Sequence, residues 1–105
     1  MKKTLLIAAG LFAAVSSSVV FAADGKALYA DKTCNACHGP TGTKPIMPDY
    51  PKIAGQNAKY IEKQMTDIKS GARANGNSAA MKGVMHLVSE QEIKVLAEYI
   101  SKLKP

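Results

Sequence analysis

Strand patterns are almost absent from this sequence. No stretch alternates apolar and polar side chains over six positions, which is the pattern of a half-buried β-strand. Internal repeats and low-complexity segments are also missing from residues 23–105. These absences argue against a sheet protein or a repeat array, and the sequence predicts an all-α domain whose helices are joined by loops.

Cysteine is scarce as well. The two cysteines, Cys34 and Cys37, lie three positions apart, so a disulfide between them would close a very small loop and restrain little of the unfolded chain. A chain of 105 residues is enough for one domain with a thin hydrophobic core, and domains of this size commonly need an added stabilising group. We therefore expect something other than a disulfide to complete the core.

A strong charge of either sign is also lacking. The formal net charge is +6, and loss of residues 1–22, which include Lys2 and Lys3, would lower it to +4. The sequence has no basic helix with interleaved aromatic residues, so it does not predict binding to nucleic acid. A mildly basic chain is suited instead to brief docking on acidic protein surfaces.

The N-terminal segment has the order of residues that is typical of a secretory signal peptide. Lys2 and Lys3 precede an uncharged apolar run over residues 5–15, serines follow at 16–18, and Val20 and Ala22 suit a cleavage site after Ala22. We expect a signal peptide over residues 1–22, cleaved after Ala22, and an exported domain without stable membrane insertion. The alternative is an uncleaved anchor that ends at residue 23, since about 20 apolar residues can span a membrane, but serines interrupt this stretch.

Two helices are predicted in the first part of the exported domain, residues 23–105. Asp24 is a suitable cap for a helix over residues 25–31. A second helix is expected from Asn57 to about Ser70, with Gly71 as its stop signal. Apolar residues spaced by three and four form one stripe along it. This stripe consists of Ala58, Ile61, Met65 and Ile68.

The last predicted helix has the clearest start. Ser89 and Glu92 form a capping box, and Val88 and Ile93 are placed for a hydrophobic staple. Glu90 favours the positive end of this helix. The inner face of the helix is predicted to hold Ile93, Leu96, Ala97, Ile100 and Leu103.

Two long segments between the predicted helices are expected to be mostly loop. They cover residues 39–56, which are rich in glycine and proline, and residues 72–88. Loops of this length are uncommon in a small domain unless they have a function. Because they flank the helix that starts at Asn57, they can wrap around a flat group.

The strongest signal in the sequence is the Cys-Asn-Ala-Cys-His motif at residues 34–38, because this spacing is that of c-type haem attachment. Each thiol adds across one vinyl group of the haem and forms a thioether. Residues three apart on a helical turn project from the same side, so two sulfur atoms can meet two vinyl groups on one edge of the ring. The next residue, His38, then binds the iron. The motif predicts one covalent haem c, held by Cys34 and Cys37.

Other uses of such a cysteine pair fit the sequence less well. A thioredoxin-like redox pair needs a strand before it and a parallel sheet around it, and neither is predicted. A zinc site built from Cys34, Cys37, His38 and His86 lacks the usual ligand spacing, because the two histidines lie 48 positions apart. A chance occurrence of the motif in a small exported helical protein is the remaining alternative.

Four further segments carry a family resemblance. They are Gly-Lys-Ala-Leu-Tyr at 25–29, Pro-Lys-Ile-Ala-Gly at 51–55, Leu-Ala-Glu-Tyr at 96–99, and a longer string at 53–71. Together with the haem motif they make residues 23–105 similar to the class I c-type cytochromes. The longer string is especially like the bacterial periplasmic cytochromes, both single-haem and two-haem. Since the chain has one motif, it resembles one half of the two-haem kind.

The residues alone leave the sixth ligand to the iron open. Methionine is the usual partner in electron carriers. Met65 lies in an apolar stripe and is expected in the core, whereas Met47 follows the attachment motif too closely to reach the opposite face of the haem easily. Met81 and Met85 both precede the capped last helix, and His86 is a further alternative that would give bis-histidine ligation.

The resemblance assigns two of these roles. It implies that Met81 is the sixth ligand, because its spacing to Gly83 and Ser89 is similar to that of the bacterial group. It also implies that Nδ1 of His38 donates a hydrogen bond to the carbonyl of Pro51. An iron-bound histidine usually donates its other N–H group to such a fixed acceptor.

The resemblance further implies the small all-α class I cytochrome c fold, with three to five helices around one haem. It implies a periplasmic carrier of single electrons between respiratory redox proteins, and not an enzyme. Lys44, Lys52 and Lys82 fall in the two loops expected to border the haem, where they are placed to steer an acidic partner.

Overall fold

The computed structural model describes residues 18–105, with side chains from residue 24 onward. The predicted signal peptide, residues 1–22, therefore falls mainly outside the described residues, and so does most of the alternative anchor. None of the helices in the described part is both long enough and apolar enough to cross a membrane.

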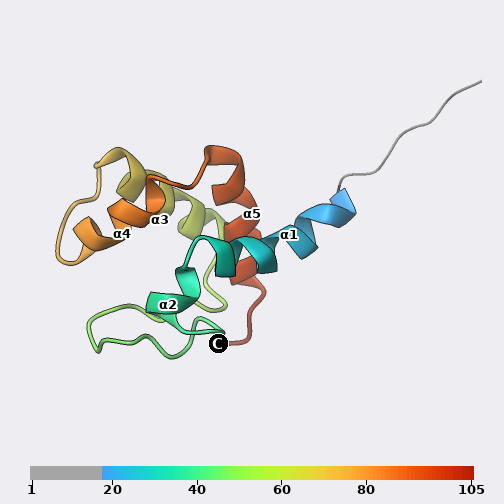
Figure 1. Ribbon diagram of the computed structural model, residues 1–105, viewed down its shortest axis with the longest axis horizontal. Coiled ribbons are helices and arrows are strands. Elements are labelled where there is room, and N and C mark those ends of the chain that lie inside the picture. Colours follow the sequence, from blue (N-terminus) through green and yellow to red (C-terminus); the bar gives the residue numbers. More distant parts are fainter. Residues whose placement is uncertain (1–17) are drawn as a thin grey trace, which may run out of the picture.

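Residues 18–105 form five helices and no strand (Figure 1). The helices are α1 (Ser18–Asp31), α2 (Cys34–His38), α3 (Ala58–Ser70), α4 (Ser78–Met85) and α5 (Glu90–Ser101). The prediction of an all-α fold with three to five helices is confirmed. Helices α1 and α3 both pack against α5, while α4 packs against α3 and α2 lies beside the end of α1.

Helices α1 and α5 approach each other closely because Gly25, at their contact, has no side chain. A Cβ atom added to Gly25 would lie only 2.6 Å from Cβ of Tyr99. The ring of Tyr29 packs at 5.8 Å, centre to centre, against the ring of Tyr99. These residues join the two terminal helices, and Leu96 packs in the same core cluster.

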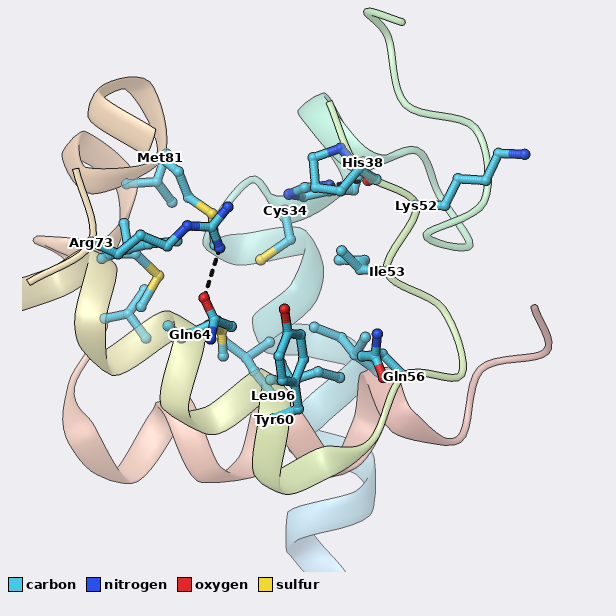
Figure 2. A pocket seen from close by; sticks show the side chains of 18 residues that line it. Cys34, His38, Lys52, Ile53, Gln56, Tyr60, Gln64, Arg73, Met81 and Leu96 are labelled. Atoms are coloured by element: carbon cyan, nitrogen blue, oxygen red, sulfur yellow. Dashed lines mark hydrogen bonds between the residues drawn. The ribbon is translucent and has the colours of Figure 1, made fainter. Parts of the chain in front are cut away.

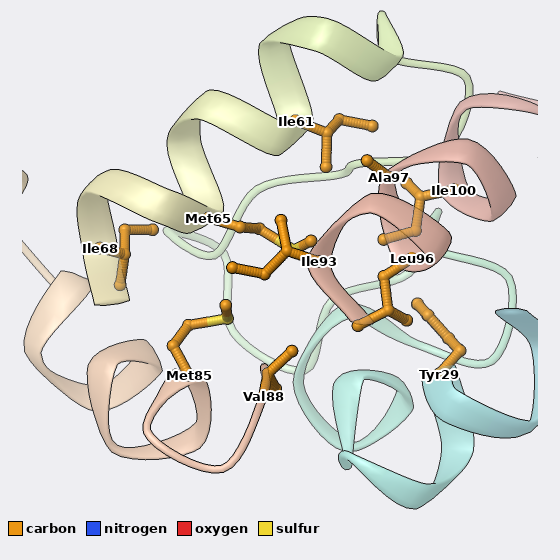
Figure 3. Packing of buried hydrophobic residues seen from close by; sticks show 10 residues of the cluster. All are labelled: Tyr29, Ile61, Met65, Ile68, Met85, Val88, Ile93, Leu96, Ala97 and Ile100. Atoms are coloured by element: carbon orange, nitrogen blue, oxygen red, sulfur yellow. The ribbon is translucent and has the colours of Figure 1, made fainter. Parts of the chain in front are cut away.

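One cluster of buried apolar side chains forms the core between α1, α3, α5 and the end of α4 (Figure 3). The apolar stripe of α3 contributes Ile61, Met65 and Ile68, as predicted. The remaining members are Tyr29, Met85, Val88, Ile93, Leu96, Ala97 and Ile100. Because α5 lies between α1 and α3, its inner face is the most completely buried surface of the described chain.

The predicted boundaries of α3 and the predicted start of α5 agree with the structure. Asn57 caps α3 by accepting a hydrogen bond from the Tyr60 amide, and Gly71 ends that helix in the left-handed conformation at φ 91°. The capping box of α5 is complete, because Ser89 Oγ accepts from the Glu92 amide at 3.1 Å and Glu92 Oε1 accepts from the Ser89 amide at 2.9 Å.

The structure corrects three expectations about helix boundaries. Helix α1 begins at Ser18 and not at Gly25, so Asp24 lies within the helix and is not its cap. No proline or glycine lies between Ser18 and Asp24, and the helix continues through this stretch. Helix α5 ends at Ser101, which leaves the predicted inner-face residue Leu103 outside it.

The third correction concerns the segment 72–88, which was expected to be mostly loop. Residues Ser78–Met85 within it form α4. Two alanines in its first turn are good helix formers, while Gly83, which argues against a helix, is tolerated near the end. By contrast, residues 39–56 contain no helix or strand, as predicted.

Candidate functional site

The attachment motif forms α2, a single helical turn set at an angle to α1. Thr33, between the two helices, has a left-handed backbone with φ 61°, and this reverses the chain just before Cys34. Both cysteines are free thiols and half-buried. Burial raises the pKa of the Cys34 thiol to about 11, so the thiol is neutral at pH 7.

The last turn of α1 is tied to the end of α2 by a buried phenol. Tyr29 Oη donates a hydrogen bond of 2.7 Å to the carbonyl of Gly39. Burial, with a smaller contribution from neighbouring Cys34, raises the pKa of Tyr29 to about 12, which keeps the phenol protonated as a donor. The motif is therefore fixed to the terminal helices by a bond that sequence reasoning did not anticipate.

His38 is buried and oriented by the following loop. Its Nδ1 lies 2.9 Å from the carbonyl oxygen of Pro51. A carbonyl can only accept, so Nδ1 carries the proton, and the lone pair of a neutral ring is then on Nε2. The loop is held in place by further bonds, from the Ile46 amide to the Cys37 carbonyl and from the Ile53 amide to the Gly42 carbonyl. The structure thus makes the contact expected between His38 and Pro51.

Two cavities, of about 240 and 390 Å³, lie next to α2. Five residues line both of them: His38, Pro51, Ile68, Arg73 and Met81. The smaller cavity also contacts Cys34 and is closed by side chains of α3 and α5 (Figure 2). The larger one also contacts Cys37 and extends toward the loops that carry Tyr50 and Asn77.

The candidate axial residues differ in their positions. Met81 is half-buried on α4 and lines both cavities, as His38 does from α2. Met85 and Met65 line only the smaller cavity and are buried in the core cluster. Met47 is 46% exposed, and neither it nor His86, which is also exposed, is among the residues that line these two cavities.

Sequence reasoning missed the polar residues at the cavity edge. Arg73 donates to Gln64 Oε1 at 2.9 Å and lines both cavities, and the ion pairs found among the described residues do not involve it. Asn77 Nδ2 donates to Asp49 Oδ2 at 2.6 Å and so joins the two long loops. One signal was available for Arg73, because it is the only arginine in the sequence.

These residues fit a covalently bound haem. The fit rests on three features. Two free thiols lie on one helical turn, and the unprotonated Nε2 of the neighbouring His38 can donate an electron pair to a metal. The thioether of Met81 borders the same cavities from another helix. The walls are largely apolar side chains, including Ile53, Ile68 and Leu96. Cys34 and Cys37 would hold the group, and His38 and Met81 are the candidate ligands of its iron.

Comparison with known proteins shows the family of this chain. The profile of the family described as Cytochrome c matches residues 22–104. Cytochrome c-553 of Nitratidesulfovibrio vulgaris is 34% identical over 103 residues, which cover 96% of this chain and 99% of that protein. Cytochrome c4 of Pseudomonas aeruginosa is 41% identical over 83 residues, which cover 79% of this chain and 38% of that protein.

The fold has a solved counterpart as well. The crystal structure of reduced recombinant cytochrome c4 from Pseudomonas stutzeri matches with a TM-score of 0.71 and 32% identity, over 88% of this chain and 53% of that one. The chain thus spans about half of that structure and 38% of the curated cytochrome c4 relatives that it matches. This chain belongs to the cytochrome c family as a class I c-type cytochrome.

Proposed function

We propose that this protein is a periplasmic carrier of single electrons with one haem c, attached through Cys34 and Cys37 and ligated by His38 and Met81. Its proposed role is to shuttle electrons between respiratory redox proteins and not to act as an enzyme. The signal peptide over residues 1–22, cleaved after Ala22, is part of this proposal because it would deliver the chain to the periplasm.

One observation carries the proposal: His38 and Met81 border the same two cavities from different helices. A haem bound there would supply an iron centre that accepts and returns one electron. Pro51 holds the ring of His38 in the tautomer whose Nε2 can act as a ligand. A histidine and a thioether together would fill both axial positions, so a substrate would have no easy access to the iron.

The surface near α2 supports brief docking of a partner. Ile46 and Met47 are 64% and 46% exposed, and the amide of Ile46 is bonded to the carbonyl of Cys37. Lys44 and Lys52 are exposed on the same loop. Apolar contact surrounded by positive charge favours fast association with an acidic protein and ready release.

Carbon monoxide distinguishes a carrier from an enzyme with an open sixth position. The reduced holoprotein should bind carbon monoxide poorly at neutral pH, and its oxidation and reduction should be reversible in voltammetry as a one-electron couple. Rapid, stoichiometric binding of carbon monoxide to the wild-type protein would contradict the proposal and favour an open-site haem protein.

Acid–organic extraction tests the attachment separately. The haem should stay with the polypeptide, and the Cys34→Ala, Cys37→Ala variant should release any haem that it binds. If the wild-type protein lost its haem to the organic phase, the thioether assignment would be wrong.

N-terminal sequencing tests the proposed cleavage. Protein recovered from the periplasm should begin at Ala23, and a sequence that begins at Met1 would contradict the proposed cleavage.

A further inference from the structure

The turn that follows α4 is held by two lysines from other parts of the chain. Its amides bond within the turn, from His86 to Lys82 and from Val88 to Met85 among others. Its carbonyls point outward to ammonium groups. Lys69, near the end of α3, donates to the carbonyls of Met85, at 3.1 Å, and Val88.

The second lysine reaches the same turn from the segment that follows α1. Lys32, just after α1, donates to the carbonyl of Leu87 at 3.0 Å, and its Nζ lies 3.6 Å from a carboxylate oxygen of Glu92 at the start of α5. Lys69 differs from it, because none of the ion pairs among the described residues includes Lys69. The charge of Lys69 is thus directed at backbone carbonyls near the negative end of α4, where a positive charge is favourable.

This arrangement bears on which methionine can reach the iron. Met81 and Met85 lie one turn apart on α4, and both line the smaller cavity. A helical turn advances the chain by about 5.4 Å, so a slide of α4 by one turn would bring Met85 to the place of Met81. Apolar packing alone is a weak guard against such a slide, because methionine side chains are flexible and adapt to irregular spaces. The hydrogen bonds of Lys69 are directional and act on the backbone of Met85 itself.

We propose that Lys69 is a positioning residue that fixes α4 along α3 and thereby holds Met81, and not Met85, toward His38, with Lys32 as a weaker second anchor. The inference rests on the proposed ligation of the iron by Met81. Lys69 touches neither the haem nor its iron in this account, since its effect passes through the backbone of α4.

Imidazole competition on the ferric holoprotein tests this role, because imidazole binds to the iron only when the methionine leaves. The Lys69→Met variant keeps the length of the side chain and removes its donors. It should bind imidazole about tenfold more tightly than the wild type, the scale expected for loss of a hydrogen bond from a charged group. It should also weaken the far-red absorption band of sulfur-ligated ferric haem. Lys69→Arg, which keeps the charge and the donors, should restore most of the far-red band and bring the imidazole affinity back close to that of the wild type.

A matched control lies on the same helix. Lys63 has a 72% exposed side chain and, among the described residues, pairs only with Asp67 one turn away. The Lys63→Met variant should therefore leave imidazole affinity and the far-red band unchanged. If Lys69→Met lowered the melting temperature but changed imidazole affinity by less than twofold, Lys69 would serve folding alone and the inference would be overturned.

Two further outcomes are decisive. If Lys69→Met yielded no holoprotein, Lys69→Gln would decide, because it removes the charge and shortens the side chain that reaches the carbonyls of Met85 and Val88. A rise in imidazole affinity of about threefold supports the account, and an unchanged affinity overturns it. Failure of the proposed function has a different signature, since the far-red band would then be absent from the wild-type protein itself.

Discussion

Two regions of this molecule are stabilised in different ways. In the terminal-helix region, formed by α1, α5 and the adjoining side of α3, side chains fill the interior, and Ile93, Leu96 and Ile100 are at most 2% exposed. In the cavity region, formed by α2, the loop 39–56 and α4, the chain borders two cavities of about 240 and 390 Å³, and side chains of α3 and α5 form the other wall of the smaller one.

This difference indicates which part of the fold depends on protein packing and which depends on the cofactor. The terminal-helix region has a continuous apolar core and a complete capping box. The cavity region is held by isolated bonds, such as those between His38 and Pro51 and between Asn77 and Asp49. In such a small domain the core is thin, so the attached group is expected to decide whether the whole chain folds.

The largest expected effect comes from removing the attachment. The Cys34→Ala, Cys37→Ala chain without haem should be largely unfolded, with little helical signal in circular dichroism and no cooperative melting. The reason is that the cavity region would lose the group around which its elements are arranged. A cooperative helix melt close to that of the holoprotein would show that protein packing alone folds the chain and would contradict this dependence on the cofactor.

A substitution in the core should lower the stability of the protein and leave the haem site intact. Ile93 is 1% exposed and does not line either cavity, so Ile93→Ala in the holoprotein should lower the free energy of unfolding by about 2–5 kcal/mol. Denaturant unfolding measures the loss. Lys94→Ala, at the exposed next position, should change stability little. A changed far-red band in Ile93→Ala would show that the two regions are coupled more tightly than proposed.

Surface charge near the cavity region should affect rates and not stability. Lys44→Glu and Lys82→Glu should slow electron transfer to an acidic partner several-fold at low salt, and the difference should shrink at high salt because ions screen these exposed charges. Stopped-flow kinetics at several ionic strengths measures this, with Lys94→Glu on α5 as the control. If the wild-type rate did not depend on ionic strength, docking would rest on apolar contacts such as those of Ile46 and Met47.

The smallest expected effect is a pH dependence at the start of α5. The hydrogen bond from the Ser89 amide, and to a lesser degree the charge of Lys32, lowers the pKa of Glu92. The capping contact therefore contributes stability above the pKa of an unfolded glutamate, about 4.3, and that contribution is lost as the pH falls through the lower pKa of the folded state.

The size of this contribution is small, because the Glu92 side chain is still 31% exposed and water screens its charge. Glu92→Gln should reduce stability at pH 7 by no more than about 0.5 kcal/mol and reduce the acid dependence below pH 4.5. Unfolding curves of both proteins at pH 7 and pH 3 test this. An equal loss of stability between these two pH values in both proteins would exclude Glu92 as the group responsible.

The two regions also differ in what the sequence predicts. The stripe of α3, the capping box at Ser89 and the stop at Gly71 follow from local patterns and were found correctly, and the start of α3 was predicted to within one residue. Helix α4 was missed, because its short apolar face packs on α3 and the cavity and has no clear start signal, since the side chain of Asn77 does not cap it.

For the site, the spacing of residues 34–38 was enough to identify the thiols and the histidine. The contacts of Arg73, Tyr29 and Lys69 depend on residues that are distant in sequence, so no local pattern marks them.

The central claim, that Met81 completes the coordination opposite His38, is tested most directly by the far-red absorption band of the ferric holoprotein in two variants. Met81→Ala should abolish the band and open the iron to added ligands, whereas Met85→Ala should keep the band and lose stability, because Met85 is buried in the core. Loss of the band in Met85→Ala with its retention in Met81→Ala would contradict the account and move the ligand one turn along α4.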